Sequence, residues 1–134
     1  MTLGAADALR YVGALATIVV GAVHLQQYAD FIQDVPTIGV LFLLNAAGAG
    51  AVTILLATRR VTLGVIGAIA LSAGALVSIA ISMTAGGLFG YTEPTFRLPV
   101  TISVVAEAAA IVLLLAYLAA RRVPHRPRVD WSAA

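Results

Sequence analysis

Four side chains could do chemistry within otherwise apolar segments of this sequence: His24, Asn45, Ser78 and Glu107. An imidazole, an amide, a hydroxyl and a carboxyl group can together bind a proton, an ion or the polar head of a small ligand. Polar groups are costly inside a bilayer, so they normally face a bundle interior or a cavity and have a partner. Two interpretations follow: a ligand-binding site, or a polar network that only fixes the register of the helices.

Other chemistries have little support in the sequence. The chain has no cysteine, which excludes thiolate metal sites and thiol redox chemistry. One histidine and one carboxylate at depth fall short of the three or four ligands of a usual metal site, so none is predicted. A haem held by two histidines would need two copies of His24, because His125 lies in the basic tail. No nucleophile–base pair has catalytic spacing, so we predict no catalytic residue and favour a protein that is not an enzyme.

Long uncharged segments must position these side chains. The chain is 61% hydrophobic and only 10% charged, with a mean hydropathy of +1.02, far from the composition of soluble domains. Charges leave four segments that approach or exceed the roughly 20 residues needed to cross a bilayer. Runs such as residues 40–44 and 111–115 do not alternate as barrel strands do. We therefore predict an all-α, four-helix transmembrane bundle, one integral membrane domain over 1–134, with helices near 8–29, 36–58, 62–85 and 98–121.

The four polar residues fall at similar depths in this arrangement. At 1.5 Å per residue, Asn45, Ser78 and Glu107 lie roughly 12–13 Å from the outer helix ends, and His24 roughly 9 Å. Small residues such as Gly21 and Gly74 share helical faces with them, which favours close packing with polar atoms turned inward. The sequence thus predicts one polar layer to which each helix contributes.

The arginines predict the orientation. With both termini in the cytoplasm, only Arg97 faces outward, and the other seven face inward. This N-in/C-in topology explains the basic tail, residues 122–134, as a topology anchor beside membrane lipids, so nucleic acid is not an expected partner. We expect a multi-pass protein of the bacterial cytoplasmic (inner) membrane.

Two outer loops flank the polar layer. The sequence predicts that Arg97 pairs with Asp30, Asp34 or Glu93 and closes a lid over the layer, with Tyr28 beside it. The favoured interpretation of the aromatic residues here, Tyr28 among them, is instead the interfacial belt that many membrane proteins carry.

In length, predicted topology and glycine-rich spans over about residues 8–121, the chain resembles the small four-helix DoxX-like membrane proteins of bacteria. No diagnostic motif carries the resemblance, so it implies no residue roles. It implies an association with membrane oxidoreductase assemblies and quinone-linked partners. The chain also looks like the small multidrug resistance family, but that family carries its essential Glu in the first helix, whereas Glu107 is in the fourth.

Three functions remain open. The first is an outward-side intramembrane site around the four polar residues that binds a small lipophilic or protonatable ligand, with a quinone-type molecule as a possible cofactor. The second is a non-catalytic accessory subunit of a larger membrane respiratory or redox complex, in which the polar residues lock the bundle. The third is a transporter, which would need a homo-oligomer. A cavity that reaches Glu107 would favour binding, and direct packing without a void would favour the structural role.

Overall fold

The computed structural model describes residues 4–93 and 95–122, and this part of the chain contains four long helices. They are α1 (Ala5–Gln27), which a π-helical turn η1 (Tyr28–Ile32) continues, α2 (Ile38–Ala57), α3 (Val61–Ser82) and α4 (Leu98–Arg121). All four are long and apolar enough to cross a membrane. The predicted all-α, four-helix fold is therefore confirmed. The predicted basic tail lies outside the described residues, apart from Arg122.

Several helix ends differ from their predicted positions. The first helix was predicted near 8–29, but α1 spans Ala5–Gln27. The start of α2 was predicted at Pro36, but the helix begins at Ile38, after Thr37 takes a positive φ of 66°. The end of α3 was predicted near residue 85, but the helix ends at Ser82. The hydroxyls of Ser82 and Thr84 donate hydrogen bonds to the carbonyls of Ile79 and Ile81, and such local bonds compete with helix continuation.

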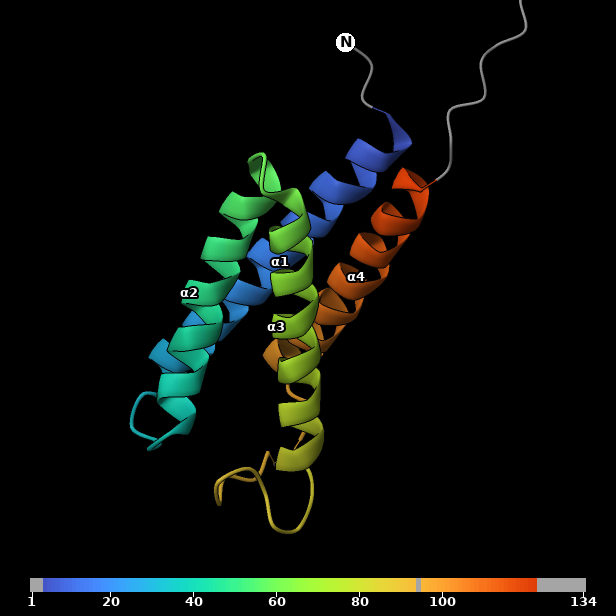
Figure 1. The fold of residues 1–134 in the computed structure, drawn as a ribbon. Helices are drawn as coiled ribbons and strands as arrows, with labels where there is room; N and C mark the ends of the chain where they lie inside the picture. The colour runs from blue at the N-terminus through green and yellow to red at the C-terminus, as the bar shows by residue number, and fades with distance from the viewer. Residues whose placement is uncertain (1–3, 94, 123–134) are drawn as a thin grey trace, which may run out of the picture.

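The helices form a ring in chain order. α1 packs against α2 and α4, and α3 packs against α2 and α4, whereas α2 and α4 do not pack on each other within the described residues. Figure 1 shows α1 behind α3, with α2 and α4 on either side and with the start of α1 and the end of α4 at the same end of the bundle. We call this end the terminal end, and the other, which carries residues 28–37, 83–93 and 95–97, the loop end.

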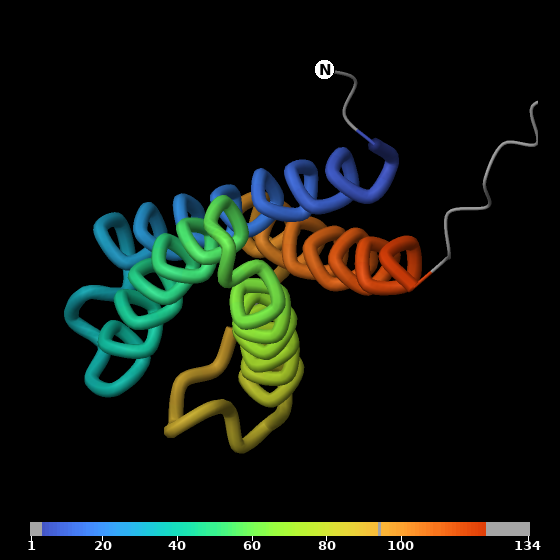
Figure 2. The backbone as a smooth tube through the Cα atoms, turned by 45° about the horizontal axis from the view of Figure 1, so that its top comes forward, coloured from blue at the N-terminus to red at the C-terminus, as the bar shows by residue number. Residues whose placement is uncertain are grey.

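The apolar core sits toward the terminal end. Its buried members come from three helices, namely Leu56, Val65, Ala68, Leu114 and Tyr117. Glycines allow the close approach there: a Cβ on Gly64 would lie 2.7 Å from the backbone nitrogen of Leu56. Small residues have this role in many membrane bundles. Figure 2 shows α3 separating from the pair α1 and α4 away from this core.

The loop end is closed by backbone structure rather than by apolar packing. Residues 88–91 form a tight turn in which the backbone N–H groups of Leu88 and Tyr91 each donate to the other's carbonyl, at 2.8 and 2.9 Å. Phe89 and Gly90 both have positive φ, as this kind of hairpin turn requires. The Glu93 N–H then donates to the Ser82 carbonyl at 3.0 Å, which returns the chain to the end of α3.

Candidate functional site

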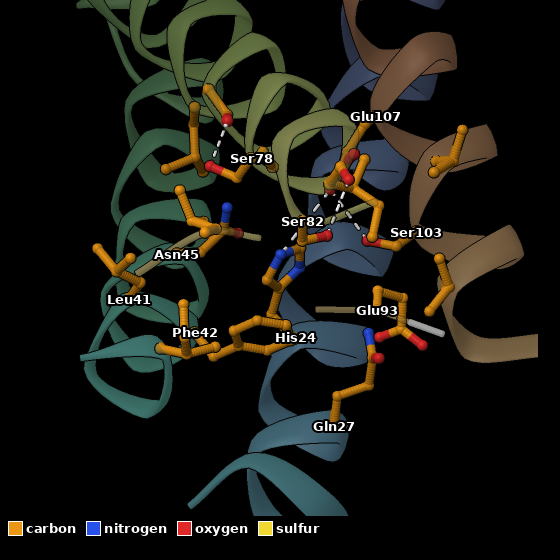
Figure 3. Close-up of a pocket in the computed structure, with 18 of the residues that line it drawn as sticks. His24, Gln27, Leu41, Phe42, Asn45, Ser78, Ser82, Glu93, Ser103 and Glu107 are labelled. Carbon is orange, nitrogen blue, oxygen red and sulfur yellow. Dashed lines mark hydrogen bonds and ion pairs between the residues drawn. The ribbon is translucent and has the colours of Figure 1, made fainter. Parts of the chain in front are cut away.

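A cavity of about 370 Å³ lies among the four helices near the loop end (Figure 3). All four of the predicted residues, His24, Asn45, Ser78 and Glu107, line it, so the structure brings them together around one chamber. Most of the remaining lining is apolar, with polar groups at a few points, as in typical ligand pockets. Its other polar members are Gln27, Ser82, Tyr91, Glu93 and Ser103.

Glu107 is the most deeply placed ionisable group of the cavity. Its side chain is almost fully buried, and the Ser103 hydroxyl donates a hydrogen bond of 2.9 Å to its Oε1 atom. Ser103 and Glu107 are four residues apart on α4, so both face the same side of that helix. This spacing is the sequence signal that could have added Ser103 to the candidate site. The hydrogen bond from Ser103 thus fixes the orientation of the Glu107 carboxyl group within the cavity.

His24 faces Glu107 from α1 (Figure 3). Its Nε2 atom lies 3.8 Å from Oε1 of Glu107, which is an ion pair only while the imidazole is protonated. Its Nδ1 atom lies 2.9 Å from the Val20 carbonyl, which requires a hydrogen on Nδ1. In the neutral ring, Nε2 is then the acceptor. The separation of 3.8 Å is too long for a direct hydrogen bond, so Nε2 and Oε1 can both bind a third group.

The α2 and α3 members behave differently from a closed network. The Ser78 hydroxyl donates to the Gly74 carbonyl of its own helix at 2.8 Å, so it is satisfied without the other three residues. The Oδ1 atom of Asn45 is buried and has no hydrogen-bond partner among the described residues. The four side chains therefore do not form the self-satisfied network that was one of the two interpretations, since neither Asn45 Oδ1 nor the Ser78 hydroxyl is bonded to another of them. They surround a cavity instead, because α2 and α3 lie apart at this level.

The predicted lid is half correct. Arg97 makes two hydrogen bonds to Glu93, at 3.1 and 2.9 Å, and the Tyr91 hydroxyl donates a third at 2.9 Å. The carboxylate of Glu93 is buried and lines the cavity, so this cluster covers its end. Tyr28 and Asp30 do not belong to it, since Tyr28 is outside the cavity lining and Asp30 is exposed.

The ionisation of the lid cluster follows from these contacts. The hydrogen bonds to Glu93 raise the pKa of Arg97, so the guanidinium stays charged. Burial, assisted by the hydrogen bond and negative charge of Glu93, raises the pKa of the Tyr91 phenol. Because a raised phenol pKa means that the folded state holds its proton more tightly, this contribution to stability is full below pH about 10 and is lost as pH rises above it.

Arg97→Gln is expected to destabilise the loop end. The substitution removes both guanidinium hydrogen bonds and leaves the buried Glu93 carboxylate with only the Tyr91 hydroxyl. Because the guanidinium is partly exposed, we expect a modest loss of about 1–2 kcal/mol rather than the cost of a fully buried pair. The melting temperature in detergent should fall, and fall less in Arg97→Lys, which keeps the charge but not the two-point geometry. Equal melting temperatures for wild type and Arg97→Gln would contradict this.

The cavity does not resemble a metal site. Among the residues that the structure describes, no three His, Cys, Asp or Glu side chains lie close enough to hold a metal ion. The arrangement can instead offer the acceptors Nε2 of His24, Oε1 of Glu107 and Oδ1 of Asn45 to one small polar group.

Comparison with known proteins gives no assignment. No protein-family model, no curated protein and no solved structure matches the chain. The function must therefore be argued from the cavity itself.

Proposed function

We propose that this protein binds a small lipophilic ligand in the cavity beside Glu107. The observation that carries the proposal is the cavity of about 370 Å³ whose wall contains a buried carboxyl, an imidazole and an unpartnered amide oxygen. A purely structural polar cluster would satisfy itself, because each unpaired buried polar atom costs roughly 1–3 kcal/mol. Asn45 Oδ1 lines the cavity, unlike the other buried atoms without a partner among the described residues, which belong to Arg10, Thr53 and Ser72. A ligand that bonds to it and fills the gap between His24 and Glu107 would supply the missing hydrogen bonds.

The polar atoms define the head of the ligand. Nε2 of neutral His24, Oε1 of Glu107 and Oδ1 of Asn45 all accept hydrogen bonds, so the head carries hydroxyl or amine donors. The carboxyl group of Glu107 disfavours an anionic head in this low-dielectric setting. A quinone-type ligand in its reduced, dihydroxy form meets both conditions. The apolar remainder of the lining suits an apolar ring or chain.

The placement in the membrane is also part of the proposal. The arginines at the terminal end, among them Arg10, Arg59, Arg60 and Arg121, favour that end on the cytoplasmic side of a bacterial inner membrane. The loop end, with its single Arg97, then faces outward. The cavity lies in the outer leaflet, and both chain ends lie in the cytoplasm.

The experiment is a purification in mild detergent of wild type beside Glu107→Gln, followed by native mass spectrometry and an absorption spectrum. We expect a small molecule to co-purify with wild type and to be lost or much reduced in Glu107→Gln, which keeps the size of the side chain but not its charge. The matched control is Thr53→Val on α2, which also keeps the size of a polar side chain, at a half-buried position outside the cavity lining. It should retain the ligand.

Two results would overturn the proposal. If wild type and Glu107→Gln are both free of small molecules and bring down the same stoichiometric membrane partner, the accessory-subunit function replaces ligand binding. If the protein is instead a ligand-free oligomer that carries protons or cations in vesicles, the transporter replaces it.

A further inference from the structure

We propose that the ligand enters from the lipid through a lateral opening between α2 and α3, and that its single apolar chain stays in this opening after the head has bound. The inference rests on the proposed function and adds to it the route of entry and the shape of the ligand. It follows from where the wall of the cavity is exposed.

The exposed residues of the cavity lining all belong to α2 and α3. They are Leu41 and Leu44 on α2 and Ala70 and Gly74 on α3. By contrast, the lining residues of α1 and α4 are buried or half-buried, as Val100 and Ser103 illustrate. The opening is therefore in the side of the bundle that faces lipid.

The contacts between α2 and α3 show where the opening begins. Toward the terminal end the two helices touch: a Cβ on Gly67 would lie 2.7 Å from Val52, and one on Gly48 would lie 3.1 Å from Leu71. One turn farther toward the loop end, a Cβ on Gly74 would meet nothing within 4 Å. The two helices thus part just beyond Leu71, and Figure 1 shows the same divergence from their shared hairpin.

The end of the cavity near the loops, in contrast to the opening between α2 and α3, is closed. Glu93, which is buried, sits there under its hydrogen bonds from Arg97 and Tyr91. In Figure 3, Glu93 and Gln27 lie on one side of the chamber, and Leu41, Asn45 and Ser78 lie on the other. A ligand that comes through the α2–α3 opening therefore passes Asn45 before its head reaches His24 and Glu107.

The apolar composition of the opening favours a ligand that carries an apolar chain. Its rim consists of aliphatic side chains and a glycine, with no charged group among Leu41, Leu44, Ala70 and Gly74. An apolar chain that lies across this rim stays in contact with lipid and protein and never meets water. The ligand class is therefore a head with hydroxyl donors that bears one flexible apolar chain.

The test compares two probes on purified full-length protein: decylubiquinol, which carries a ten-carbon chain, and the hydroquinone with the same ring and no chain. The variant is Gly74→Leu, which places an apolar side chain at the opening, at a position where an added Cβ meets nothing within 4 Å. The control is Gly50→Leu on α2, an exposed glycine whose added Cβ also meets nothing within 4 Å and which is not in the cavity lining.

We expect Gly74→Leu to weaken decylubiquinol binding about tenfold, which corresponds to about 1.4 kcal/mol. The chain-free hydroquinone should bind wild type and Gly74→Leu equally, and Gly50→Leu should match wild type with both probes. Equal binding of decylubiquinol to wild type and Gly74→Leu would overturn the lateral opening while leaving the binding site intact. Equal weakening of both probes would also overturn it, because Gly74 would then border the head rather than the chain. If wild type binds neither probe, the proposed quinol-binding function fails, and the opening fails with it.

Discussion

Glu107→Leu is expected to weaken ligand binding strongly without lowering the stability of the fold. A hydrogen bond to a carboxylate contributes about 1.5–3 kcal/mol, so decylubiquinol binding should weaken roughly 10- to 100-fold. The fold, by contrast, loses a group that costs a few kcal/mol to bury in a membrane. The melting temperature in detergent should therefore stay the same or rise.

The neighbours of Glu107 explain why its loss is tolerated. His24 lies 3.8 Å away, beyond hydrogen-bond distance, and keeps its bond to the Val20 carbonyl. Ser103 loses its acceptor but can donate to a carbonyl one turn earlier on its own helix. Glu107→Gln is the matched comparison: its amide oxygen still accepts from Ser103, and its binding should also be much reduced, though less than that of Glu107→Leu. A lower melting temperature together with unchanged binding would contradict the prediction and assign Glu107 a structural role.

Gly64→Ala is expected to be the most destabilising single-methyl change in the α2–α3 hairpin. The added Cβ would lie 2.7 Å from the Leu56 nitrogen and 2.9 Å from the Leu55 carbonyl carbon. Both atoms belong to the backbone of α2, so no side chain can rotate away, and the two helices must separate. Overpacking of this kind costs about 1–3 kcal/mol. The measurement is the melting temperature of purified protein in detergent, which should fall.

Gly74→Ala is the matched control on the same helix. Its added Cβ meets nothing within 4 Å, so only the better helix propensity of alanine remains, worth up to about 1 kcal/mol. Its melting temperature should equal or exceed that of wild type. If the two variants shift the melting temperature by the same amount, the close α2–α3 contact at Gly64 does not stabilise the bundle.

The lid shows how far spacing alone can predict a contact. The sequence offered Asp30, Asp34 and Glu93 as partners for Arg97, and the structure selects Glu93. Glu93 and Arg97 are close in the chain and joined by a short segment, so their pairing is local. Asp30 is excluded by the π-helical turn at Tyr28–Ile32, which leaves its side chain exposed. No periodicity in the sequence predicts that π-helical turn.

The sequence by itself determined the four membrane-spanning helices and which of their residues are polar at similar depth. Length and hydropathy fix the spans, because a bilayer requires about 20 apolar residues in a row and full internal backbone bonding. The faces of the helices then place Glu107 and His24 toward the interior, since 3.6-residue periodicity puts a buried stripe on one side.

Only the tertiary structure decided that these residues surround a cavity rather than satisfy one another. That outcome depends on how α2 and α3 pack along their lengths, through close contacts at Gly64, Gly67 and Gly48 toward the terminal end. The spacing of α2 and α3 at the level of Asn45 and Ser78 decides between direct hydrogen bonds and a chamber of about 370 Å³. Residue types and spacing constrain how deep a side chain lies in the bilayer and on which face of its helix. The distance between two helices, however, results from many packing contacts between them, so it cannot be predicted from either helix alone.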